Sequence, residues 1–191
     1  MPAKILAFAG STRTESWNKK LIRIAAEGAR AEGAEVTLVD LRDFPMPLYD
    51  GDLEAQSGIP EHGKRLKKLF LEHGGLLISS PEYNSSVTGV PKNAIDWVSR
   101  PEPNEPSLAA FIGKVAGLVS ASPGALGGQR ALVHLRSILG NIKTLVIPEQ
   151  VSVPKANEAF NPDGTLKDAK LKANVENVGR ALAKLVAKLQ A

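Results

Sequence analysis

Short apolar runs alternate along this chain with longer segments of helical periodicity, and this alternation constrains the fold more than any other feature. The runs at residues 4–9, 35–41, 75–80, 114–121 and 144–147 are near-continuous apolar runs rather than alternating ones, which is typical of parallel strands covered on both faces. Helices are predicted at residues 18–32, 60–72, 91–98, 124–139 and 168–190. The alternation predicts a doubly wound α/β sandwich, with one domain over residues 1–191.

Prolines mark two of the predicted boundaries. Residues 44–52 (FPMPLYDGD) are predicted to form a loop, and Pro91 is predicted at the first position of its helix, where the missing N–H is tolerated. Two interpretations of the apolar side chains in the loop stay open, a contact with a neighbouring subunit or packing over the chain's own sheet; these side chains are Phe44, Met46, Leu48 and Tyr49.

Composition excludes several classes of function. The net charge is +4 with a pI of about 9.3, but the excess lysines and arginines are dispersed through the second half, so no nucleic-acid partner is predicted. The chain has no cysteine, which excludes thiol catalysis, and His62, His73 and His134 lack the spacing of a metal site. No apolar run approaches the length of a membrane span, and a cytoplasmic location is expected.

Ligands of doubly wound sheets bind beyond the carboxyl ends of the strands, so the loops after the first, third and fourth strands are candidate sites. The first is GSTRTESWN, residues 10–18, in which several hydroxyl groups surround Arg13 at the start of a helix. It matches neither a Walker A loop nor a G-x-G-x-x-G fingerprint, so it is interpreted as a cradle for a terminal monophosphate. The alternative is that Ser16 or Asn18 only caps the helix.

The third strand runs into PEYNSSVTGVPKNAIDW, residues 81–97. A carboxylate, an aromatic ring and an amide follow Pro81 directly, and Gly89 permits a close backbone approach. This composition suits the wall of a pocket for a flat heteroaromatic ring. The alternative is an ordinary loop whose Tyr83 packs inward.

The two segments together resemble a known family. GSTRTESWNKKL is similar to the G-S-x-R-x-x-S-x-N-x-x-L motif of the NAD(P)H-dependent FMN reductases, and PEYNSSVTGVPKNAIDW is similar to their P-x-Y-N-x-S-x-x-G-x-x-K-N-A-I-D-W signature. The resemblance implies a flavodoxin-like three-layer sandwich with a five-stranded parallel sheet of order 2-1-3-4-5. It also implies FMN as cofactor, NADPH or NADH as reductant, and a homodimer or homotetramer.

Carried over position by position, the resemblance assigns a cofactor-binding role to three groups of residues. The 5′-phosphate would be held by Ser11, Arg13, Ser16, Trp17 and Asn18, where Trp17 occupies a variable motif position. The flavin ring would be lined by Pro81, Glu82, Tyr83 and Asn84. The loop SASPGALGGQRA (residues 120–131) would contribute Ser120 and Gly124, whereas Gly127 and Gly128 either approach the ring or serve helix packing.

The implied reaction passes hydride from a nicotinamide to the flavin and on to a quinone, azo compound, free flavin or chromate-type acceptor. No residue is assigned a strictly catalytic role, because the cofactor carries the chemistry and Glu82 matches a ring-wall contact better than a general base. Two alternatives remain: a flavodoxin-type electron carrier without nicotinamide turnover, for which a basic chain is atypical, and a binding module that has kept the fold without flavin.

Overall fold

The computed structural model describes residues 2–190, and a parallel five-stranded sheet forms its centre. The strand order is β2-β1-β3-β6-β7, which confirms the predicted order 2-1-3-4-5. The strands are β1 (Lys4–Ala9), β2 (Glu35–Asp40), β3 (Gly75–Ser79), β6 (Val115–Ala121) and β7 (Leu145–Val153). The central strands β3 and β6 are buried at every position, as their continuous apolar sequences require.

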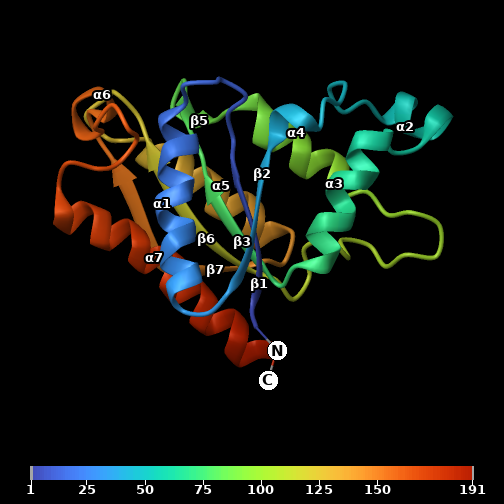
Figure 1. Cartoon of the computed structure of the whole chain (residues 1–191). Helices are drawn as coiled ribbons and strands as arrows, with labels where there is room; N and C mark the ends of the chain where they lie inside the picture. The colour runs from blue at the N-terminus through green and yellow to red at the C-terminus, as the bar shows by residue number, and fades with distance from the viewer. Residues whose placement is uncertain (1, 191) are drawn as a thin grey trace.

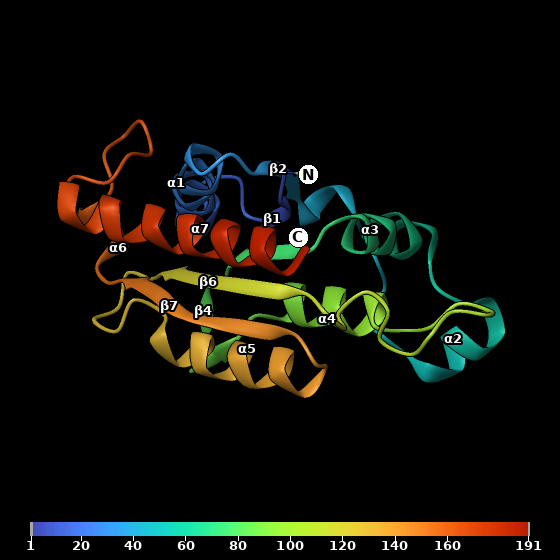
Figure 2. The ribbon, with the colours of Figure 1, turned by 90° about the horizontal axis from the view of Figure 1, so that it is seen from below.

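Helices cover both faces of the sheet and give a three-layer sandwich (Figures 1 and 2). On one face, α1 (Trp17–Ala31) and α7 (Ala169–Gln190) share an apolar core with β1, β3 and β6. The core on the other face is formed with α3 (Glu61–Glu72), α4 (Gly89–Val98) and α5 (Gln129–Asn141). The apolar stripe of α7 belongs to the first core, where Val175, Val178 and Leu182 are buried.

Two short helices were not predicted. The first is α2 (Gly51–Ser57), which has no buried residue and begins where the Asp50 carboxylate accepts hydrogen bonds from the N–H groups of Asp52 and Leu53. It projects from the body of the molecule near the segment that joins α4 to β6 (Figures 1 and 2). The second is α6 (Ala156–Ala159), directly after β7.

Three of the predicted boundaries were wrong. Helix α4 begins at Gly89, so Pro91 lies in its first turn but not at the first position. Helix α5 begins at residue 129 instead of 124, because Gly127 and Gly128 have φ values of 60° and 90° and cannot continue a helix.

The third wrong boundary is the end of the last strand, which was placed at residue 147. Strand β7 continues to Val153 through an irregularity in its pairing with β6 that contains Pro148. The Arg136 guanidinium donates to the carbonyl oxygens of Val146 (3.2 Å) and Ile147 (2.9 Å) at this irregularity. A proline at an irregularity of an edge strand is tolerated because it interrupts no continuous ladder.

None of the helices within residues 2–190 combines the length and the apolar character needed to span a membrane. The same residues contain no cluster of three or more metal-binding side chains.

Candidate functional site

The first loop leaves β1 at Gly10, where the chain passes close to α4. The Gly10 N–H donates to the Ser79 carbonyl (2.8 Å), and its own carbonyl accepts from the Thr88 hydroxyl (2.7 Å). A Cβ atom at this position would lie 2.7 Å from the Pro91 ring. Glycine is therefore required here by packing, and the loop is anchored at its start to both β3 and α4.

The start of α1 has the properties of an anion site. Ser16 is the N-cap residue, and its hydroxyl makes no capping hydrogen bond, so the alternative of a simple helix cap by Ser16 is not supported. The first turn contains no acidic residue, and Glu15 just before it is paired with Lys20 at 3.4 Å. Ser11 and Ser16 are buried, whereas Arg13 is exposed with its guanidinium 6.0 Å from the centroid of the Trp17 ring. Free N–H groups, hydroxyls and one cation suit a phosphate.

Asn18 is buried and ties the start of α1 to the sheet. Its Nδ2 donates to the Ala121 carbonyl (2.8 Å), and its Oδ1 accepts from the Ala121 N–H (3.0 Å) and the Ser79 hydroxyl (2.8 Å). The side-chain amide therefore links the carboxyl ends of β3 and β6 to the first loop. It borders the pocket, but its oxygen is committed to protein donors.

The segment after β3 is a small hairpin, which the sequence interpretation described only as a loop. It consists of β4 (Glu82–Tyr83) and β5 (Ser86–Val87), paired antiparallel. The two turn residues, Asn84 and Ser85, have φ values of 50° and 64°, as a type I′ turn demands. Tyr83 is 55% exposed, so the alternative of an inward-packed Tyr83 is wrong.

Glu82 connects this hairpin to α5. Its carboxylate accepts from the N–H groups of Arg130 (3.0 Å) and Ala131 (3.2 Å) and from Arg130 Nε (3.0 Å). These bonds satisfy the first turn of α5 with a charge that complements the helix dipole. The carboxylate is therefore held at the start of α5.

The loop after β6 packs closely against the other two loops. The Ser120 hydroxyl donates to the Ser80 carbonyl (2.7 Å), and a Cβ atom at Gly128 would lie 1.8 Å from that hydroxyl. The Gly124 carbonyl accepts from the N–H groups of Gly127 (3.2 Å) and Lys155 (3.3 Å). Ser120, Gly127 and Gly128 therefore have packing roles, so the packing alternative for the two glycines is supported.

These three loops enclose a pocket of about 190 Å³ at the carboxyl ends of β1, β3 and β6. It brings together the predicted residues of the first loop and of the hairpin, but not Asn84, Ser120 or Gly124. Three residues that directly follow Ser120 line it and were not predicted. The full lining is Ser11, Arg13, Ser16, Trp17, Asn18, Pro81, Glu82, Tyr83, Ala121, Ser122 and Pro123.

The second half of the motif, KNAIDW, does not reach this pocket. Asn93 accepts from the Tyr49 N–H (2.8 Å) and donates to the Pro47 carbonyl (2.9 Å), to which Trp97 Nε1 also donates (2.8 Å). Tyr49 packs edge-on against Trp97 with ring centroids 5.1 Å apart. The amide and the indole thus hold residues 47–49 against α4.

The loop of residues 44–52 packs partly over its own sheet, because Phe44 is buried in the core whereas Leu48 is 80% exposed.

The residues present fit FMN. The Ser16 hydroxyl, which makes no capping hydrogen bond, the uncapped start of α1 and Arg13 suit the phosphate. Pro81, Ala121 and Pro123 offer small, flat apolar surfaces, and the aromatic Tyr83 stands at the pocket edge, as a planar ring system requires.

A parallel sheet of order 2-1-3-6-7, with a phosphate-compatible pocket beside the switch point between β1 and β3, defines a flavodoxin-like nucleotide-binding protein. Residues 3–158 match the family described as NADPH-dependent FMN reductase. The chain belongs to this family, which confirms the resemblance found in the sequence. It is an oxidoreductase that uses FMN and NAD(P)H, and the electron-carrier and non-flavin alternatives are not supported.

Similar proteins agree with this assignment over the whole chain. An NAD(P)H-dependent FMN reductase of Pseudomonas aeruginosa is 36% identical over 189 residues, covering 98% of this chain and 97% of the relative. An NAD(P)H:quinone oxidoreductase of Solanum tuberosum is 35% identical, covering 98% of this chain and 94% of the relative. The solved structure of FerB, a flavoenzyme NAD(P)H:(acceptor) oxidoreductase from Paracoccus denitrificans, has a TM-score of 0.81 at 28% identity and covers 97% of this chain and 98% of its own.

Proposed function

We propose that this protein binds FMN in the pocket between the first loop, the hairpin and the loop after β6, and that it uses NADPH or NADH to reduce quinones. The observation that carries the proposal is the pocket itself, in which an uncapped helix start and Arg13 lie beside flat apolar surfaces. The quinone acceptor is supported by the similarity to a plant NAD(P)H:quinone oxidoreductase over nearly the whole chain.

The protein's part in the reaction is to bind and orient. The hydroxyls of Ser11 and Ser16 and the guanidinium of Arg13 would hold the 5′-phosphate, while Pro81, Tyr83 and Pro123 would border the ring. Bound FMN supplies the redox chemistry, taking reducing equivalents from the nicotinamide and passing them to the acceptor. Glu82 would stay with α5 and offer no proton.

The activity is tested on the purified protein under anaerobic conditions, by adding NADPH and following the visible flavin band. We expect the band to bleach with NADPH and to return when a benzoquinone is added. A flavin band that persists with both NADPH and NADH would overturn the proposed reaction, and no flavin after soaking with FMN would overturn the binding site.

The phosphate contact is tested with Arg13→Ala. Loss of one charge-assisted contact is expected to weaken FMN binding by about 1.5–3 kcal/mol, roughly 10- to 150-fold in Kd. Riboflavin has no phosphate, so its affinity should not change. Quenching of flavin fluorescence measures both constants, and an unchanged Kd for FMN would contradict the assignment of Arg13.

Azo compounds, free flavin and chromate are proposed as further acceptors, on the basis of the resemblance alone, and the same anaerobic assay tests each of them.

A homodimer or homotetramer is also proposed. The exposed apolar side chains of Tyr83, Leu126 and Val133 support a subunit contact near the pocket, and sedimentation velocity tests it. A cytoplasmic location is proposed because the reaction consumes a reduced nicotinamide, and cell fractionation tests it.

A further inference from the structure

Arg42 reaches the proposed phosphate loop from a distant part of the chain. It lies in the 3₁₀ turn η1 (Leu41–Asp43), which follows β2. Its Nη1 donates to the Thr14 hydroxyl (3.1 Å), and its Nη2 donates to the Thr12 carbonyl. The two nitrogens of one guanidinium thus hold both sides of Arg13, although Arg42 itself does not line the pocket.

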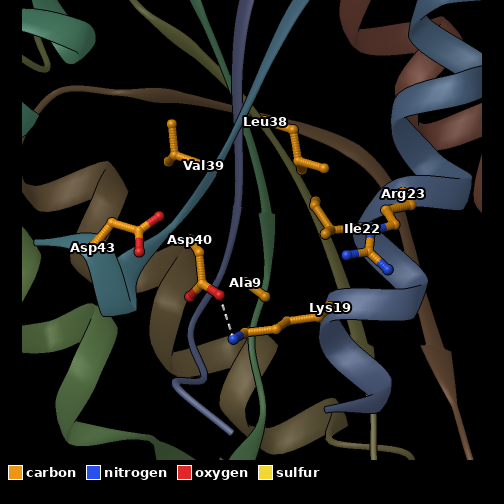
Figure 3. A pocket seen from close by; sticks show the side chains of 8 residues that line it. All are labelled: Ala9, Lys19, Ile22, Arg23, Leu38, Val39, Asp40 and Asp43. Carbon is orange, nitrogen blue, oxygen red and sulfur yellow. Dashed lines mark hydrogen bonds and ion pairs between the residues drawn. The ribbon is translucent and has the colours of Figure 1, made fainter. Parts of the chain in front are cut away.

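The backbone that carries Arg42 is fixed by Asp40. The Asp40 carboxylate accepts from the Arg42 N–H (3.0 Å) and from Lys19 Nζ (2.5 Å), and Lys19 belongs to the first turn of α1 (Figure 3). Partial burial raises the pKa of Asp40, but the bonds from Lys19 and the Arg42 backbone outweigh it and hold the pKa below its ordinary value. Asp40 is therefore ionised at neutral pH. Through it, the end of β2 holds both Lys19, which follows the proposed phosphate loop, and Arg42, whose side chain binds that loop.

The loop has little internal support. One side-chain hydrogen bond joins two residues of the loop: the Arg13 N–H donates to the Ser11 hydroxyl at 3.3 Å. A planar guanidinium can hold two acceptors in a fixed relation, which a single ammonium group cannot. A loop ordered before the ligand arrives loses less conformational entropy on binding.

We propose that Arg42 is a positioning residue for the flavin phosphate: by holding Thr12 and Thr14 it orders the loop around Arg13, and so it sets the preference of the pocket for FMN over unphosphorylated riboflavin. The inference rests on the proposed function, which places the phosphate at residues 11–18.

The test compares the dissociation constants of FMN and riboflavin for the wild type and for Arg42→Ala, Arg42→Lys and Arg30→Ala, measured by quenching of flavin fluorescence. For Arg42→Ala we expect the FMN constant to rise about five- to tenfold, as for loss of a pair of exposed hydrogen bonds, with riboflavin within about twofold. Arg42→Lys keeps the charge but not the fork, so most of the loss should remain. Arg30 is the matched control, because its guanidinium bonds Glu27 and the Val36 carbonyl at the other end of α1.

A general loss of structure would weaken both flavins together, so the FMN-to-riboflavin ratio separates positioning from folding. Thr14→Val removes one acceptor of Arg42. The double variant Arg42→Ala/Thr14→Val should therefore lose less FMN affinity than the sum of the losses in the two single variants. If Arg42→Ala does not fold, Arg42→Lys and Thr14→Val carry the same test.

Two outcomes separate failure of this inference from failure of the proposed function. If Arg13→Ala weakens FMN but Arg42→Ala leaves the FMN-to-riboflavin ratio unchanged, the role of Arg42 is overturned and the phosphate site stands. If Arg42→Lys restores wild-type affinity in full, long-range charge and not positioning is the cause, which also overturns it. If the wild type binds neither flavin, the proposed function itself fails.

Discussion

Lys114 carries an ammonium group into the protein just before β6, at the end of the sheet opposite the proposed flavin pocket. It is buried, and its Nζ donates to the His73 carbonyl at 2.6 Å. Burial lowers its pKa from 10.5 to about 8, because the charged form loses its hydration. The folded state therefore binds this proton less tightly than the unfolded chain does.

The sign of the effect on stability follows from proton linkage. Between pH 8 and 10.5 the unfolded state holds more protons, so this group makes the free energy of unfolding rise with pH by up to about 3 kcal/mol. Lys114→Met should remove that rise and should be more stable than the wild type at pH 7. Urea unfolding at pH 7 and at pH 10 measures it, with Lys64→Met on an exposed position of α3 as control. Equal pH dependence in Lys114→Met and the wild type would contradict the burial penalty.

Single residues also show where prediction from sequence ends. The resemblance assigned Asn18, Glu82 and Ser120 to the site; Asn18 and Glu82 line the pocket, whereas Ser120 does not. Their hydrogen bonds to Ala121, Arg130 and Ser80 join segments far apart in the chain, and no local pattern reports such a contact. A motif fixes which positions matter, whereas the partner of each side chain depends on the tertiary structure.

At the scale of elements, the packing of α1 on α7 depends on two glycines. A Cβ atom at Gly28 would lie 1.9 Å from the Glu176 carbonyl oxygen, and one at Gly179 would lie 1.9 Å from the Ala25 carbonyl oxygen. Both are buried inside helices, where glycine is otherwise unfavourable by roughly 1 kcal/mol relative to alanine. The backbones approach so closely that no side chain fits between them.

We expect Gly179→Ala to lower the free energy of unfolding by about 3 kcal/mol or more, since the obstacle is backbone and cannot rotate away. Gly140→Ala is the matched control: Gly140 lies in α5, and apart from the nearby backbone of its own helix no atom lies within 4 Å of the added methyl position. There alanine should raise the free energy of unfolding by about 0.5–1 kcal/mol through helix propensity. Chemical denaturation measures both, and a Gly179→Ala protein as stable as the wild type would contradict the close helix packing.

Elements differ in how well the sequence predicts them. The five strands of the sheet were predicted from their apolar runs, and the long helices were predicted because burial of one face imposes a helical periodicity. Helix α2 buries no side chain, and it is held through Glu54, which bonds Tyr49 and Arg100. The hairpin β4–β5 consists of two-residue strands, too short to show alternation. Both depend on contacts outside their own sequence.

For the whole molecule, the strand order was available only through the resemblance to a family. Apolar runs predict parallel strands covered on both faces, but several strand orders would satisfy that pattern. The switch point between β1 and β3 brings together loops that are about 70 and 110 residues from the first one in sequence. The proposed flavin site is thus a property of the complete sheet, and its occupancy should be linked to the stability of the whole chain.

This linkage gives a prediction that also tests whether residues 1–191 form one domain. FMN at about 100 times its Kd should stabilise the folded state by roughly 2.7 kcal/mol, which corresponds to about 5–10 °C in Tm for a chain of this size. Because both cores share the strands that carry the pocket, the shift should apply to a single unfolding transition seen equally by circular dichroism and tryptophan fluorescence. Riboflavin at the same concentration should give a smaller shift, and Arg13→Ala should lose most of the shift with FMN. Two separate transitions, of which FMN moves only one, would show that the chain unfolds as more than one domain.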